Sequence, residues 1–64
     1  MKNRIREIRK QKRMTLSDLS QKTTYSIAYL SDIERGNRAG KLALDRIADA
    51  LEVPVSDLIE QEAS

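Results

Sequence analysis

The sequence contains no cysteine and no histidine. Disulfide bonds are therefore excluded, and so are the usual zinc ligand sets, which draw on thiolates and imidazoles. A catalytic site built on a thiol or an imidazole beside a carboxylate is excluded as well. We expect apolar packing to hold the fold, and we expect a protein that is not an enzyme and that uses no metal or cofactor.

Long apolar runs are also absent. No stretch approaches the roughly 20 apolar residues that a membrane span requires, and no apolar signal-peptide segment follows Met1. The sequence therefore predicts a soluble, cytoplasmic protein that forms one domain over residues 1–64. A chain this short buries only about 60% of its unfolded surface on folding, so we expect a thin stability margin.

The net charge of +2 hides a strong asymmetry along the chain. Residues 1–13 carry seven basic side chains against one acid, Glu7, which gives +6. The remaining residues carry five basic groups against nine acids, which gives −4. Such a separation suits a protein with one face for a polyanion, although a solvated basic helix produces the same pattern.

Helical periodicity dominates the apolar pattern, and two tyrosines are the only aromatic residues. We predict a compact all-α domain of five short helices, at residues 3–12, 16–22, 27–35, 41–51 and 55–60. The apolar residues that recur at helical spacing form the predicted core, namely Leu19, Leu30, Ile33, Leu44, Ile47, Leu51 and Leu58.

Capping signals divide residues 15–36 into two helices joined by a tight turn. Thr15 offers a hydroxyl N-cap, and Asp18 three residues later is placed to complete a capping box. Ser26 is placed to cap the next helix, and Gly36 is a left-handed stop after it. Two short helices joined this tightly cross steeply and leave the second one projecting, a geometry that fits a DNA major groove.

This stretch resembles the lambda repressor and Cro-like family of helix-turn-helix proteins. The run YLSDIERG at residues 29–36 is its most specific part, and TLSDLSQKT at residues 15–23 precedes it. RIADAL at residues 46–51 and VPVSDLI at residues 53–59 match the family's fourth and fifth helices. The resemblance covers nearly the whole chain and implies a domain that binds double-stranded DNA with its third helix in the major groove.

The resemblance also assigns site residues. The positions that face bases in relatives are Ile27, Ala28, Tyr29 and Asp32. The positions that contact the DNA backbone are Thr15, Ser26, Asn37, Arg38 and Lys41. Helix N-termini and basic side chains suit that second role, because both attract phosphate.

The side chains at the base-facing positions favour particular bases. Ile27 and Ala28 can meet thymine methyl groups, and Asp32 can accept a hydrogen bond from cytosine N4, so we expect T-rich or C-containing half-sites. Asp32 can also act by rejecting wrong sites, since an acid repels phosphates. Tyr29 is compatible with stacking, with a phosphate contact or with packing under its own helix.

Three positions depart from the family's pattern. Leu16 stands where relatives often carry a glutamine that reaches a phosphate, so we do not include this position among the phosphate contacts. Thr24 replaces a common turn glycine, which predicts a positive φ at a residue with a Cβ. Gly40 stands where a serine usually caps the fourth helix.

The resemblance also implies one salt bridge and the surroundings of one tyrosine. Arg9 and Glu34 match a salt bridge that ties the first helix to the third, which we favour over a carboxylate site. Tyr25 stands where relatives place an aliphatic residue, and we expect it to be half buried.

Relatives commonly dimerise around the fifth helix, where Val55 and Ile59 are candidates for a dimer interface or for peripheral core packing. We therefore predict a homodimeric transcriptional regulator, by default a repressor, that binds an inverted-repeat operator and has no evident small-molecule ligand. The alternative is an antitoxin-like or adaptor module whose helix-turn-helix contacts another protein, supported by the apolar, acid-bearing third helix.

Overall fold

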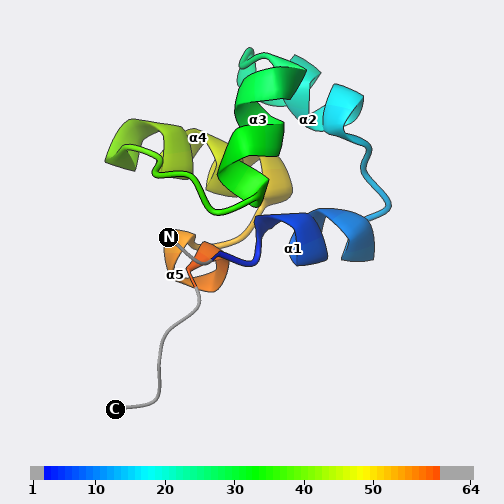
Figure 1. The fold of residues 1–64 in the computed structure, drawn as a ribbon. Helices are drawn as coiled ribbons and strands as arrows, with labels where there is room; N and C mark the ends of the chain where they lie inside the picture. The colour runs from blue at the N-terminus through cyan, green and yellow to red at the C-terminus, as the bar shows by residue number, and fades with distance from the viewer. Residues whose placement is uncertain (1–2, 60–64) are drawn as a thin grey trace.

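A computed structural model of the chain describes residues 3–59. That part of the chain folds into five helices: α1 (Ile5–Gln11), α2 (Leu16–Thr23), α3 (Ile27–Glu34), α4 (Lys41–Leu51) and α5 (Val55–Leu58). In Figure 1, α2 and α3 occupy one end of the molecule, α1 and α5 occupy the other, and α4 runs behind α3. The predicted all-α architecture is confirmed.

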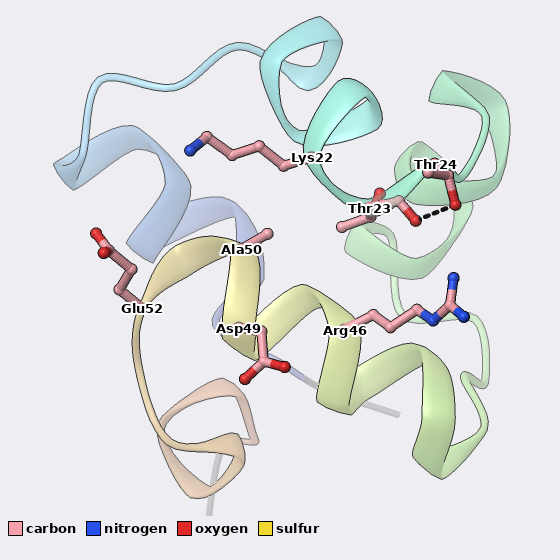
Figure 2. A pocket seen from close by; sticks show the side chains of 7 residues that line it. All are labelled: Lys22, Thr23, Thr24, Arg46, Asp49, Ala50 and Glu52. Atoms are coloured by element: carbon pink, nitrogen blue, oxygen red, sulfur yellow. Dashed lines mark hydrogen bonds between the residues drawn. The ribbon is translucent and has the colours of Figure 1, made fainter.

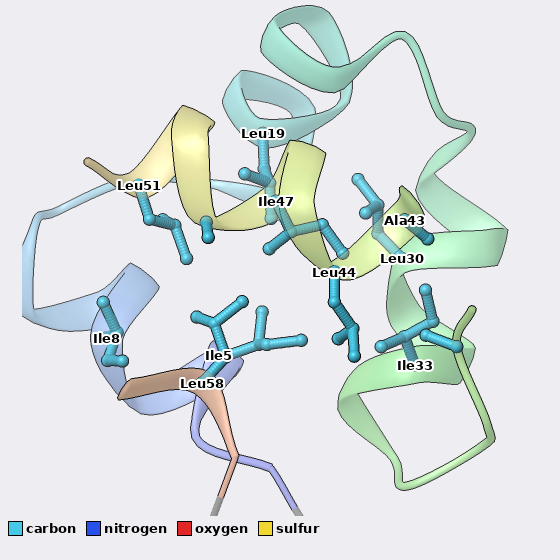
Figure 3. Close-up of a cluster of buried hydrophobic side chains, with 12 residues drawn as sticks. Ile5, Ile8, Leu19, Leu30, Ile33, Ala43, Leu44, Ile47, Leu51 and Leu58 are labelled. Carbon is cyan, nitrogen blue, oxygen red and sulfur yellow. The ribbon is translucent and has the colours of Figure 1, made fainter. Parts of the chain in front are cut away.

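A single apolar cluster holds these helices together. Every residue of the predicted core is buried, and Ile5 and Ile8 of α1 belong to the same buried cluster. Figure 3 shows Ile5 and Leu58 pointing toward the side chains of α4. Because α4 supplies five of the buried residues, it is the element on which the other helices pack.

The predicted helix ends were partly wrong. α1 begins at Ile5 rather than at residue 3, because the Asn3 side chain accepts a hydrogen bond from the Ile5 amide at 3.1 Å and donates to the Ile33 carbonyl at 2.7 Å. α5 stops at Leu58, since Ile59 is extended and pairs with Asn3 in a short antiparallel bridge. The last predicted residue of that helix, Glu60, lies outside the described residues.

The predicted caps are confirmed. The Thr15 hydroxyl accepts from the Asp18 amide and the Asp18 carboxylate accepts from the Thr15 amide, each at 3.0 Å, so both halves of the capping box are present. Gly36 has a φ of 107° directly after the C-cap of α3, and Gly40 is the N-cap of α4.

Two further residues adopt a left-handed backbone conformation that the sequence did not predict. Arg13, with a φ of 57°, follows α1, and Glu52, with a φ of 59°, is the C-cap of α4. Both close a helix in the conformation that glycine usually supplies at such a position. Within residues 3–59, the helices are all too short or too polar to span a lipid bilayer.

Candidate nucleic-acid interface

The turn between α2 and α3 is held by backbone and side-chain hydrogen bonds. Thr24 adopts a φ of 66°, as its place in the sequence predicted, and its amide donates to the Ser20 carbonyl at 2.8 Å. The Ser20 hydroxyl then donates to the Tyr25 carbonyl at 2.6 Å. The buried Thr23 hydroxyl donates to the Leu19 carbonyl at 2.8 Å. These bonds set where α3 begins relative to α2.

α3 turns one side to the core and the other to solvent. Leu30 and Ile33 are buried, whereas 48% of Ile27 and 38% of Tyr29 remain exposed, and Ala28 is exposed as well. The leading edge of α3 is therefore accessible along the residues predicted to face bases. An exposed isoleucine at the start of a short helix provides an apolar surface that thymine methyl groups fit.

Tyr29 is engaged by a neighbouring aromatic ring. Its ring meets that of Tyr25 edge to face, with centroids 5.1 Å apart and an interplanar angle of 68°. The guanidinium group of Arg46, which belongs to α4, lies 5.8 Å from the centroid of the Tyr25 ring. Tyr25 is half buried, as predicted. Tyr29 thus packs against Tyr25 and still has 38% of its surface exposed, so its contact with DNA stays a prediction.

Asp32 is paired within its own helix. Arg35, three residues further on, donates from Nη2 to Asp32 Oδ1, and both side chains remain substantially exposed. An arginine beside this carboxylate offsets the repulsion that a lone acid would exert on DNA phosphates. The pair therefore makes the outer face of α3 more compatible with a polyanion than Asp32 alone would be.

The predicted backbone-contacting residues surround α3. Thr15 and Ser26 are exposed N-caps whose hydroxyl oxygens accept from Asp18 and Tyr29 amides. A hydroxyl that accepts a bond keeps its hydrogen for donation to a phosphate. Asn37, Arg38 and Lys41 are exposed in and after the loop that leaves α3. Residues 35–44 contain no acid, so this loop is uniformly attractive to an anion.

The ion pair between α1 and α3 is present as predicted. Arg9 Nε donates to Glu34 Oε2 at 2.7 Å and Nη2 donates to Oε1 at 3.2 Å, while Nη1 donates to the Met14 carbonyl at 2.7 Å. Only 10% of the Arg9 side chain and 6% of the Glu34 side chain are exposed. The pair holds the carboxyl end of α3 against α1.

The two predicted interface residues lie at the margin of the core, Val55 at the start of α5 and Ile59 directly after its end. Val55 and Ile59 are both half buried and pack against the central cluster. Leu42, in contrast, has 65% of its surface exposed. Leu42 was not predicted as a surface residue. Its position away from the Leu44–Ile47–Leu51 stripe nevertheless indicates that it faces solvent.

The fold and this site together define a helix-turn-helix domain. A family model described as helix-turn-helix matches residues 5–58. The chain belongs to this lambda repressor-like family, whose members are DNA-binding transcriptional regulators rather than enzymes.

Two curated proteins are similar to this chain. One is the immunity repressor protein of Bacillus phage phi105, which is 38% identical over 60 residues that cover 92% of this chain and 42% of that protein. The other is the HTH-type transcriptional regulator DdrOP3 of Deinococcus deserti, which is 36% identical over 58 residues that cover 89% of this chain and 45% of that protein. The chain thus spans less than half the length of these relatives.

Proposed function

We propose that the chain is a sequence-specific double-stranded DNA-binding module of a transcriptional repressor. The observation that carries the proposal is the exposed amino-terminal side of α3, flanked by the Ser26 cap and by the acid-free loop that contains Arg38. In this arrangement α3 enters the major groove, with Ile27 and Ala28 against base edges and Arg38 against phosphate. The names of the two relatives, a repressor and a transcriptional regulator, support the same reading.

The proposal includes a homodimer on an inverted repeat in a cytoplasmic setting. A two-fold dimer places two recognition helices about 34 Å apart, on successive major grooves of one DNA face. Val55 and Ile59 stay in the proposed interface, because their partly exposed surfaces lie at the edge of the core. No cofactor or small-molecule ligand is needed for this mode of binding.

Selection of binding sites from random duplexes tests the proposal. We expect a palindromic consensus whose half-site centres lie about one helical turn apart. The affinity for the selected duplex should fall with salt, with a log–log slope of about −0.9 for each phosphate contacted. Recovery of no consensus, together with an affinity that ignores salt, would favour the protein-interaction alternative.

Arg38→Ala tests the phosphate role of the loop. Because Arg38 is exposed and is assigned to phosphate, its removal should weaken binding similarly on cognate and random duplexes and flatten the salt slope by about one unit. Lys22→Ala, which removes the same charge from α2 on the side facing α4, is the matched control and should change the slope little. A loss confined to the cognate duplex would contradict this role.

A further inference from the structure

A small groove lies where α1, the start of α2 and the end of α3 meet. It encloses about 240 Å³ and is lined by Arg6, Arg9, Leu16, Ser31, Glu34 and Arg35. None of these residues is among the DNA-contacting residues assigned from the sequence. The groove therefore needs an explanation of its own.

The charges in this groove leave a positive excess. Arg9 and Glu34 form the buried bidentate pair, so their charges cancel. Arg6 is exposed, and it forms no ion pair with another of the residues 3–59. Arg35 is paired with Asp32 through Nη2, so the excess charge comes from Arg6, while the other N–H groups of Arg35 remain able to donate. The groove thus offers two guanidinium groups to an anion.

The groove adjoins the surface proposed to read bases. Arg35 follows Ala28 by seven residues, which is close to two helical turns, so both lie on the same outer stripe of α3. Leu16, which also lines the groove, directly follows the Thr15 cap of α2. An anion in the groove would therefore lie at the flank of the recognition helix, where one strand of a duplex must pass.

We infer that this groove binds one phosphate of the DNA backbone, held by the guanidinium groups of Arg6 and Arg35. The inference rests on the proposed DNA-binding function and deepens it by naming two contacts. Leu16 has no polar group for a phosphate, and Arg6 and Arg35, which line the groove with it, supply the donors that this position lacks. Arginine suits the task because its fixed fork of N–H groups matches phosphate oxygens.

A second groove provides the comparison. It is larger, at about 430 Å³, and lies between α2 and α4 (Figure 2). Its two cations, Lys22 and Arg46, are balanced by two acids, Asp49 and Glu52. This groove has no net charge to attract a phosphate, so Lys22→Gln removes one positive charge from the molecule without touching the proposed phosphate site.

The test measures affinity against salt for the full chain on a duplex obtained by site selection. Arg6→Gln should reduce the magnitude of the log–log slope by about 0.9, while Lys22→Gln should leave it close to that of the wild type. Arg35→Gln is made in an Asp32→Asn background, so that no unpaired acid is created. Compared with Asp32→Asn alone, the double variant should have a log–log slope that is smaller in magnitude by a similar amount.

Neutral methylphosphonate linkages, introduced one position at a time, locate the phosphate. The wild type should lose affinity at one linkage in each half-site, and Arg6→Gln should lose much less at that same linkage. The phosphate assignment would be overturned if both arginine variants kept the salt slope of their parent chains, or if Lys22→Gln reduced the slope as much as they do. DNA binding itself would remain intact in either case. A wild-type chain with no salt-dependent affinity for duplex DNA overturns the proposed function and this assignment together.

Discussion

At the scale of single residues, Arg9 shows how a buried charge is accommodated in a domain of 64 residues. All three of its donor nitrogens have partners, two on Glu34 and one on the Met14 carbonyl. A buried ion pair contributes little net stability, yet removal of one partner is costly because it leaves the other charge uncompensated. The pair therefore acts mainly to hold α3 in one position against α1.

Arg9→Met should lower the free energy of unfolding by about 3–5 kcal/mol, because Glu34 is left buried and unpaired. The double variant Arg9→Met/Glu34→Leu removes both charges and should be less destabilised than the single variant. Urea unfolding followed by circular dichroism measures both. If the loss of unfolding free energy in the double variant equalled the sum of the losses in the two single variants, the coupling between the charges would be absent.

The base-reading assignment makes a different prediction at this scale. Ala28→Gln replaces a methyl group on the exposed side of α3 with a side chain that can bond adenine bidentately. We expect the preferred base at one position of each half-site to change, with a discrimination of about 1–3 kcal/mol. Ile27→Gln should change a neighbouring position. Repeated site selection is the measurement, and an unchanged consensus would remove these residues from the reading surface.

At the scale of an element, the amino terminus of α2 depends on its capping box. The Thr15 amide donates to the Asp18 carboxylate, and this bond, aided by the Thr15 hydroxyl and the charge of Lys22, lowers the pKa of Asp18 below its ordinary value. A lowered pKa means that the carboxylate form is favoured in the folded protein. The stabilisation is thus present above the ordinary pKa and is lost as the pH falls through the lowered one.

Asp18→Asn should therefore destabilise the protein at neutral pH, and the difference from the wild type should disappear in acid. The free energy of unfolding measured by urea titration across a range of pH gives both curves. Ser17→Ala, a neutral change at the exposed neighbouring residue, should shift the curve by a constant amount. A difference between Asp18→Asn and wild type that stayed constant with pH would exclude this role for the carboxylate.

At the scale of the whole molecule, the two ends of the described chain close the fold. The Arg4 amide donates to the Leu58 carbonyl at 2.7 Å, and Asn3 pairs with Ile59. Leu58 is fully buried although α5 has only four residues. A helix this short is not stable alone, so it depends on this side chain and on the paired ends.

Leu58→Ala should lower the free energy of unfolding by about 2–5 kcal/mol, because it leaves a cavity that faces α1 and α4 at once. For a domain of this size that is a large share of the total stability. Thermal unfolding by circular dichroism measures the loss, and Ser56→Ala on the exposed side of α5 is the control. Similar melting temperatures for the two variants would show that α5 is not required to close the core.

Much of the architecture could be predicted from the sequence because its causes are local. Apolar residues three and four apart define the buried side of α4, and the Thr15–Asp18 capping box joins residues within one turn. Gly36 and Thr24 carried readable signals for positive φ. The pairing of Asp32 with Arg35 is also local, because residues three apart on a helix are neighbours.

Other features were decided only by the tertiary structure. Asn3 bonds to Ile33 across 30 residues and thereby moves the start of α1, while Arg46 of α4 meets the ring of Tyr25 in the turn before α3. The groove between Arg6 and Arg35 likewise exists because α1 and α3 pack at one particular angle. The sequence by itself determined which segments are helical and which side chains are buried, because those depend on neighbours along the chain. Where the exposed cations meet depends on how the helices pack, which no local pattern specifies.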